Sequence, residues 1–130
     1  MAKITTHHYV LAVPDAARTA EFFTQQLGFE PRPVADPGWR FVARDGFMVM
    51  LGSCPDAIPP GQLGDHSFFA YLVVDDVDGY FREEQTKGVQ GLRPPEDKPW
   101  GMREFCIKTP DGHRIMIGKS NSSSEKGIKQ

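Results

Sequence analysis

The sequence predicts an α+β fold built from two tandem βαβββ modules, at residues 4–53 and 66–119. A repeated string is the first observation behind this prediction: DGFMVMLG at 45–52 recurs as DGHRIMIG at 111–118. The second is that each module places an acidic residue directly after its first strand, Asp15 and Asp76, where it can cap a helix. A repeat of about 60–66 residues is too long for a solenoid, so duplication of one module explains it better.

The first module begins with a β-rich run, ITTHHYVLAV, at residues 4–13. Asp15 then caps a helix that ends at Gly28, and its apolar stripe has helical spacing (Ala16, Ala20, Phe23 and Leu27). Three extended runs follow, at 29–34, 39–44 and 47–52, and Asp45-Gly46 between the last two is typical of a hairpin turn.

The second module repeats this order after a loop rich in proline and glycine. A strand at 66–74 leads through Asp75-Asp76, which we interpret as a helix cap, to a helix that ends near Lys87 and Gly88. Further strands are expected near 89–93, at 102–108 and at 113–118. Residues 1–120 are therefore expected to form a single domain, with a polar tail at 121–130.

Composition excludes several classes of protein. The net charge is −2, with acidic and basic residues interspersed, which favours neither a nucleic-acid partner nor a polybasic membrane anchor. No apolar run has the length of a membrane span, and MAKITTHHYV lacks the layout of a signal peptide. Cys54 and Cys106 have no CxxC companion, which favours reduced thiols. We therefore expect a cytoplasmic protein.

Strand alternation predicts which side chains face away from the helices. Val13 and Val74 lead into the helices, so their faces should pack on them, and the opposite faces should line a cavity. The expected inward residues are His8, Met48, Met50, Phe69, Tyr71, Arg114 and Met116.

Three motifs stand out along the chain: the V-x-D joint, the string Leu27-Gly28-Phe29, and PWGMREFCIKTPDGHRI at 99–115. Together they resemble the vicinal oxygen chelate superfamily, which contains glyoxalases, dioxygenases and bleomycin-resistance proteins. The string Pro99-Trp100-Gly101 with Arg103-Glu104-Phe105 is most similar to the metal-free bleomycin-resistance branch. The resemblance implies curled half-barrel sheets with the helices outside, often paired in a homodimer whose subunits exchange modules.

The resemblance also implies where metal ligands would stand. The four positions that bind a divalent ion in metal-using members fall on His8, Met50, Phe69 and Met116. A thioether suits soft ions and phenylalanine offers no donor, so only His8 could bind a hard or borderline cation. We therefore expect no metal, no other cofactor and no catalytic residue.

Methionine has flexible torsions and suits surfaces that accept varied shapes, so these positions favour an adaptable apolar pocket, although simple core filling is the plain alternative. Trp100 resembles a position that stacks on the drug in bleomycin-resistance proteins, although a surface tryptophan is equally consistent with the sequence. Arg103 and Glu104 alternate faces, so only one of them can face the ligand. The candidate ligand-binding residues are His8, Met48, Met50, Phe69, Tyr71, Trp100, Arg103, Arg114 and Met116.

The sequence thus favours a metal-free, homodimeric binding protein. It would sequester a flat, partly apolar small molecule, such as an antibiotic, in a cavity at a module or dimer interface. The alternative is a glyoxalase-like or dioxygenase-like enzyme that uses His8 as a general base or an unrecognised metal site.

Overall fold

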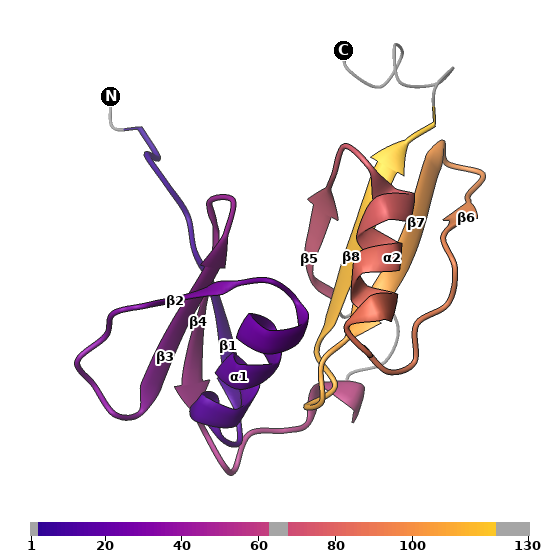
Figure 1. Ribbon diagram of the computed structural model, residues 1–130. Coiled ribbons are helices and arrows are strands. Elements are labelled where there is room, and N and C mark those ends of the chain that lie inside the picture. Colours follow the sequence, from indigo (N-terminus) through magenta and orange to yellow (C-terminus); the bar gives the residue numbers. More distant parts are fainter. Residues whose placement is uncertain (1–2, 63–67, 122–130) are drawn as a thin grey trace. The chain divides into compact units, whose positions relative to one another are not determined.

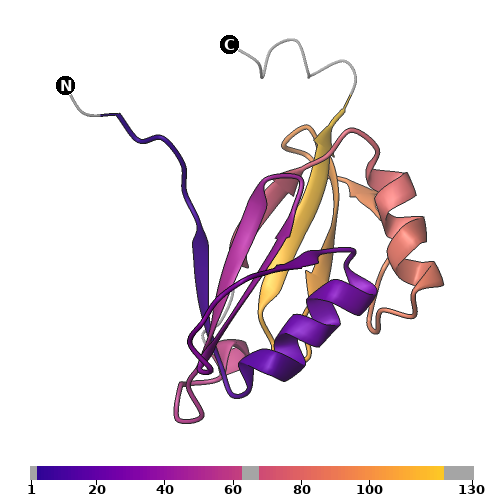
Figure 2. The same ribbon diagram turned by 60° about the vertical axis from the view of Figure 1, so that its left-hand side comes forward.

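Each half of the chain forms a four-stranded sheet with one helix packed on one face (Figure 1). The computed structural model describes residues 3–62 and 68–121 and divides the chain into two compact units, Met1–Pro59 (unit 1) and Pro60–Gln130 (unit 2). Both units have the element order expected of a βαβββ module, so the predicted α+β fold is confirmed. Figure 2 shows each helix beside the sheet of its own unit.

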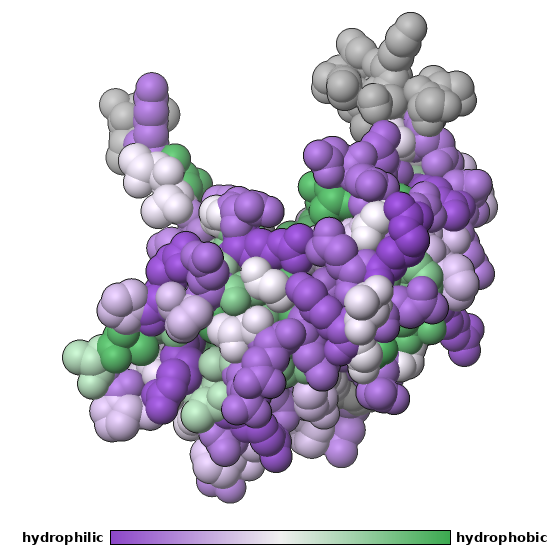
Figure 3. All heavy atoms as spheres, viewed as in Figure 1, coloured by the Kyte–Doolittle hydropathy of each residue, from purple (hydrophilic) through white to green (hydrophobic). Residues whose placement is uncertain are grey.

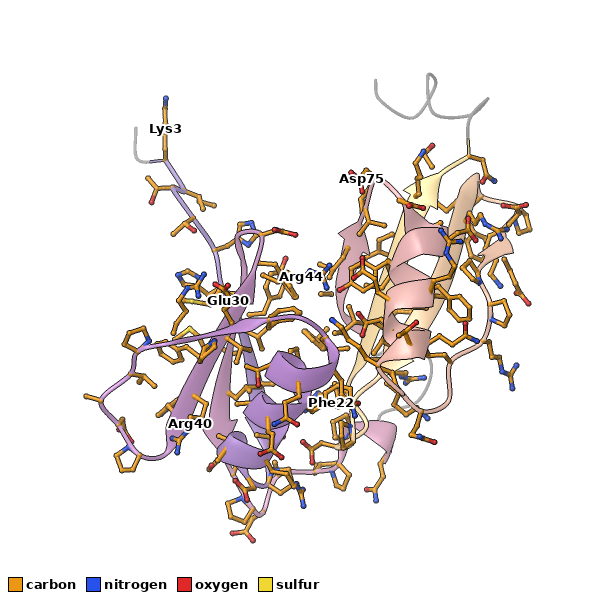
Figure 4. The ribbon with its side chains drawn as sticks, viewed as in Figure 1. Lys3, Phe22, Glu30, Arg40, Arg44 and Asp75 are labelled. Atoms are coloured by element: carbon orange, nitrogen blue, oxygen red, sulfur yellow. The ribbon has the colours of Figure 1, made fainter. Side chains whose placement is uncertain are left out.

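Unit 1 has the sheet order β1-β4-β3-β2, in which β1 runs parallel to β4 and the other pairs are antiparallel. Its elements are β1 (Tyr9–Val13), α1 (Ala16–Gln26), β2 (Glu30–Arg32), β3 (Trp39–Arg44) and β4 (Phe47–Ser53). Figure 4 marks Phe22 on α1 and Arg40 on β3.

The ends of the unit 1 elements follow the predicted local signals. The Asp15 carboxylate accepts hydrogen bonds from the backbone amides of Ala17 and Arg18, which begins α1. Asp45 and Gly46 have φ values of 51° and 86°, so both adopt the left-handed conformation that a two-residue hairpin turn requires. The hairpin between β3 and β4 is therefore a local property of the sequence.

The core of unit 1 lies between α1 and its sheet. Four aromatic rings pack edge to face in a row: the ring centroids of Tyr9 and Phe47 are 5.1 Å apart, those of Phe47 and Phe29 5.7 Å, and those of Phe29 and Phe23 5.1 Å. Val49 and Leu51 of β4 are fully buried. Because Phe47 packs on this side, Met48 and Met50 face the other side of the sheet.

Unit 2 repeats the arrangement with the sheet order β5-β8-β7-β6. Its elements are the short 3-10 helix η1 (Pro60–Gln62), β5 (Phe68–Val73), α2 (Val77–Thr86), β6 (Glu96–Asp97), β7 (Met102–Lys108) and β8 (Arg114–Ser120). Asp76 caps α2 by accepting from the Gly79 amide, and Gly88, with φ 81°, follows its end. Phe81 of α2 contacts Phe105 of β7 at a centroid distance of 5.5 Å, so Phe105 faces the helix.

The prediction of a strand near 89–93 is wrong. The structure has turns there and a two-residue strand, β6, at Glu96–Asp97. Gly91 reverses the chain with φ 73°, and Pro94 and Pro95 have no amide to donate to a ladder. The first strand is also shorter than predicted, because β1 pairs with β4 only from Tyr9 onward. Positions 66 and 67 of the expected fifth strand, and residues 122–130 of the tail, lie outside the described residues.

The surface seen in Figure 3 is mainly hydrophilic, with apolar residues in smaller patches. No helix within residues 3–62 and 68–121 has the length and apolar character needed to cross a membrane.

Candidate ligand-binding site

The face of the unit 2 sheet that points away from α2 carries three of the candidate residues, Tyr71, Arg114 and Met116. Phe105 and Ile107 of β7 and Ile115 and Ile117 of β8 are buried toward α2. The alternate residues therefore point the other way. We call this side the open face; it carries Tyr71, Glu104, Cys106, Lys108, Arg114, Met116 and Gly118.

Tyr71 spans the open face and contacts two neighbouring strands. Its ring lies over Gly118 of β8, and its hydroxyl donates a hydrogen bond to Oε2 of Glu104 on β7. Burial of the hydroxyl raises the pKa of Tyr71 well above its ordinary value, and the bond to the Glu104 carboxylate and its negative charge raise it further. Glu104 itself is 4% exposed. The pair thus places a buried carboxylate on the open face.

A β-bulge changes which phenylalanine shares this face. Phe68 pairs with Arg114 and Ala70 pairs with Ile115, so Phe69 is the extra residue on β5. The Arg114 Cζ atom lies 5.7 Å from the ring centroid of Phe68, whereas Phe69 meets His113 edge to face at 6.1 Å. Regular alternation, which places Phe69 beside Tyr71 on the inward face, therefore fails at the bulge, and Phe68 takes the place beside Arg114.

A cavity of about 340 Å³ opens on this face within unit 2. Glu104, Cys106 and Lys108 line it from β7, and Met116 lines it from β8. This volume lies within the range of small-molecule sites. Burial raises the pKa of the Cys106 thiol, so this thiol is mainly protonated at neutral pH.

Charged residues from the chain around β6 line the same cavity. They are Arg93, Glu96 and Lys98. The Lys98 ammonium lies 2.9 Å from a Glu96 carboxylate oxygen, and this contact lowers the pKa of Glu96 and raises that of Lys98. Arg93 and Lys108 are exposed. The cavity therefore has a buried acceptor at Glu104 and exposed cations at its edge.

The structure places Arg103 and Trp100 away from this cavity. The Arg103 guanidinium lies 2.9 Å from Asp78 of α2, so it occupies the helix-covered face, and its hydrogen bonds lower the pKa of Asp78. Glu104 is therefore the member of that pair on the open face. Trp100 is 62% exposed in the turn between β6 and β7, next to Gly101 with φ 85°.

The candidate residues of unit 1 lie on or beside the face of its sheet that points away from α1. Met48 and Met50 are half-buried on β4, and His8 is exposed just before β1. Trp39 of β3 lies against Gly52, where an added Cβ would meet its ring at 3.0 Å. Gly52 and Gly118 end the two repeated strings, and in both repeats the missing side chain leaves space for an aromatic ring from another strand.

From the sequence, Glu104 was only the alternative to Arg103, and Trp39 was not a candidate. The signal that could have found them is the glycine that closes each repeated string, because it marks a place where another side chain lies against the strand.

The family model described as the glyoxalase/bleomycin resistance protein/dioxygenase superfamily matches residues 5–117. The chain belongs to this superfamily. The resemblance seen in the sequence is thereby confirmed. No curated protein matches the chain.

Several solved structures share this fold. The chain is similar to a bleomycin resistance determinant encoded on transposon Tn5, with 24% identity and a TM-score of 0.74 over 92% of this chain and 100% of that one. It is also similar to the bleomycin-binding protein from bleomycin-producing Streptomyces verticillus complexed with copper(II)-bleomycin, with 21% identity and a TM-score of 0.69 over 94% and 99%. A superfamily member from Alicyclobacillus acidocaldarius has only 10% identity but a TM-score of 0.76 over 91% and 92%.

The residues at the four positions where the resemblance places the superfamily's metal ligands do not suit a divalent ion. Of His8, Met50, Phe69 and Met116, only the imidazole offers a donor suited to hard or borderline cations. Among the residues that the structure describes, no three histidine, cysteine, aspartate or glutamate side chains gather as a metal site would require.

Proposed function

We propose that this chain is a non-catalytic binding protein that holds a flat, partly apolar small molecule, such as an antibiotic. The observation that carries the proposal is the cavity on the open face of unit 2, bordered by the flexible thioether of Met116 and the buried carboxylate of Glu104. An apolar wall with a few placed polar groups is the usual composition of a ligand pocket. The structurally similar protein from Streptomyces verticillus was solved with copper(II)-bleomycin, which supports a ligand of drug-like size.

Binding energy would come mainly from apolar contact. Each Å² of apolar surface removed from water contributes about 25 cal/mol. Stacking against an aromatic side chain adds about 0.5–1.5 kcal/mol. Tyr71, Phe68 and Trp100 supply exposed aromatic surface in unit 2, and Met48 and Met50 supply adaptable surface in unit 1. We propose that His8 and Arg114 add polar contacts, while Phe69, placed at the bulge, contributes apolar surface.

A thermal-shift screen of aromatic drugs and metabolites tests the proposal. A compound present at 100 times its Kd should stabilise the folded protein by about 2.7 kcal/mol. Met116→Ala should weaken binding of any compound found, because Met116 lines the cavity. Met102→Ala is the matched control, since Met102 is half-buried on β7 and does not border this cavity. Equal loss of affinity in both variants, or no stabilising compound, would contradict the proposal.

A further inference from the structure

The Glu104 carboxylate has more acceptor capacity than the protein uses. An ionised carboxylate offers about four lone-pair positions. Within residues 3–62 and 68–121, Glu104 accepts one hydrogen bond, from the Tyr71 hydroxyl to Oε2. The side chain is 4% exposed, yet it borders the cavity. A buried carboxylate with spare acceptor positions at a cavity wall is a place where a hydrogen-bond donor of a ligand is stabilised, because water has limited access to it.

Tyr71 holds this carboxylate in position. The phenol ring lies against Gly118, so it cannot move closer to β8. Its hydroxyl donates a hydrogen bond that holds Oε2 of Glu104 in place. The remaining oxygen, Oε1, is then free to accept from a ligand in a defined direction. Tyr71 therefore acts as a positioning residue and Glu104 as the contact residue.

The charge changes sign along the same strand. Glu104, Cys106 and Lys108 alternate along β7 on the open face, so the buried acid and the exposed ammonium lie about 13 Å apart along the backbone. Arg93 adds a second exposed cation at the edge of the cavity. Lys98 is engaged by Glu96, and Arg114 lies over the Phe68 ring. The cavity thus offers an acceptor at its buried end and cations at its exposed end.

We propose that the unit 2 cavity selects an aromatic ligand with an N–H donor at its buried end and an anionic group at its exposed end. This inference rests on the proposed function, since it names the class of molecule that the same cavity takes. Glu104 would accept from the donor, and Lys108 and Arg93 would pair with the anion. An apolar middle would contact Met116 and Cys106.

Three naphthalene probes test this selection. In 5-aminonaphthalene-1-sulfonate the donor and the anion stand at opposite ends of the ring; naphthalene-1-sulfonate lacks the donor, and 1-naphthylamine lacks the anion. Binding is measured by calorimetry and, at pH 9, where more of the thiol is ionised, by protection of Cys106 from iodoacetamide. The protein carries Cys54→Ser, which leaves Cys106 as its sole thiol.

We expect the bifunctional probe to bind at least ten times more tightly than either single-function probe. In Glu104→Gln the affinity of the bifunctional probe should be less than three times that of naphthalene-1-sulfonate. In Lys108→Gln its affinity should likewise be less than three times that of 1-naphthylamine. Tyr71→Phe should reduce the donor preference while leaving the anion preference unchanged. The affinities of the three probes for the protein without these substitutions test the selection even if a Glu104 variant does not fold.

The outcomes separate the two proposals. If all three probes protect Cys106 with equal affinity, the inference about selection is overturned and the binding function stands. If none of them binds or protects Cys106, the cavity does not take flat aromatic ligands, and the proposed function is overturned as well.

Discussion

The Tyr71 ring lies so close to Gly118 that a Cβ at position 118 would stand 2.9 Å from its Cζ atom. The hydroxyl bond to Glu104 holds this same end of the ring, so the ring cannot move aside without breaking that bond. A side chain from another strand thus requires glycine at position 118.

Gly118→Ala should lower the free energy of unfolding by about 1–3 kcal/mol, the usual cost of forcing an added methyl group into a packed site. Gly52→Ala is the matched control, because the added Cβ would meet the tip of the Trp39 ring at 3.0 Å, and this half-buried side chain can shift. The control should stay within about 1 kcal/mol of the parent, since alanine also reduces the entropy of the unfolded chain. Urea unfolding measures both. In the background of Tyr71→Ala, the cost of Gly118→Ala should largely disappear, and an unchanged cost would contradict the contact.

Stability should fall at high pH because of Tyr71. Burial, with the Glu104 hydrogen bond and charge, raises the pKa of Tyr71 above its ordinary value of 10.0. A group whose folded pKa is raised contributes stability that is complete below its unfolded pKa and is lost as pH rises above it. The decline should therefore begin above about pH 10 and should be smaller in Tyr71→Phe. The difference between the phenolate absorbance titrations of the parent and of Tyr71→Phe isolates Tyr71, which should ionise above pH 10, and ionisation at its ordinary pKa would refute the prediction.

Arg103 should support the contact between α2 and β7 and should leave ligand binding unaffected. Its guanidinium lowers the pKa of Asp78, so the stability from this pair is present above the ordinary aspartate pKa, near 4, and is lost as pH falls below it. Because both side chains are partly exposed, Arg103→Gln should cost no more than about 1 kcal/mol. A double-mutant cycle with Asp78→Asn at pH 7 and pH 3 measures the coupling. Reduced binding of a ligand by Arg103→Gln, with unchanged stability, would instead support a direct contact with the ligand.

We predict that the chain forms a homodimer. β1 and β5 are edge strands, and Val10 and Val73 on them are 60% and 71% exposed. Edge strands and apolar sheet faces of this kind are commonly covered by a partner. Light scattering at micromolar concentration should give twice the mass of the chain, and Val73→Asp should reduce it. Ile58→Asp, at a similarly exposed loop position, should have no effect, and a monomeric parent protein would contradict the prediction.

Divalent metals should not stabilise the protein. Only His8 among the superfamily's metal positions has a suitable donor. Addition of Mn²⁺, Fe²⁺, Zn²⁺ or Ni²⁺ to chelator-treated protein should therefore leave the Tm unchanged. A rise of several degrees that is lost in His8→Ala would favour the alternative of a metal-dependent enzyme.

Local signals in the sequence determined the order and type of the elements. Asp15 and Asp76 cap their helices because a carboxylate next to a free helix end satisfies its amides wherever the rest of the chain lies. The Asp45-Gly46 turn forms because both residues accept positive φ. The predicted strands at 39–44 and 102–108 match β3 and β7 at both ends. Alternation within single strands placed Met48, Met50 and Met116 opposite the buried valine, leucine and isoleucine side chains.

Tertiary structure alone decided how side chains from different strands meet. The bulge at Phe68–Ala70 depends on the pairing of β5 with β8, and it moves Phe68 to the place that alternation gave to Phe69. The choice between Arg103 and Glu104 depended on Asp78, which α2 brings to one face of β7. The bond between Tyr71 and Glu104 joins residues 33 positions apart, through the space that Gly118 leaves free. A sequence pattern specifies the face of a strand, but a site of this kind arises from sheet register and helix packing, which fix the distances between residues far apart in the chain.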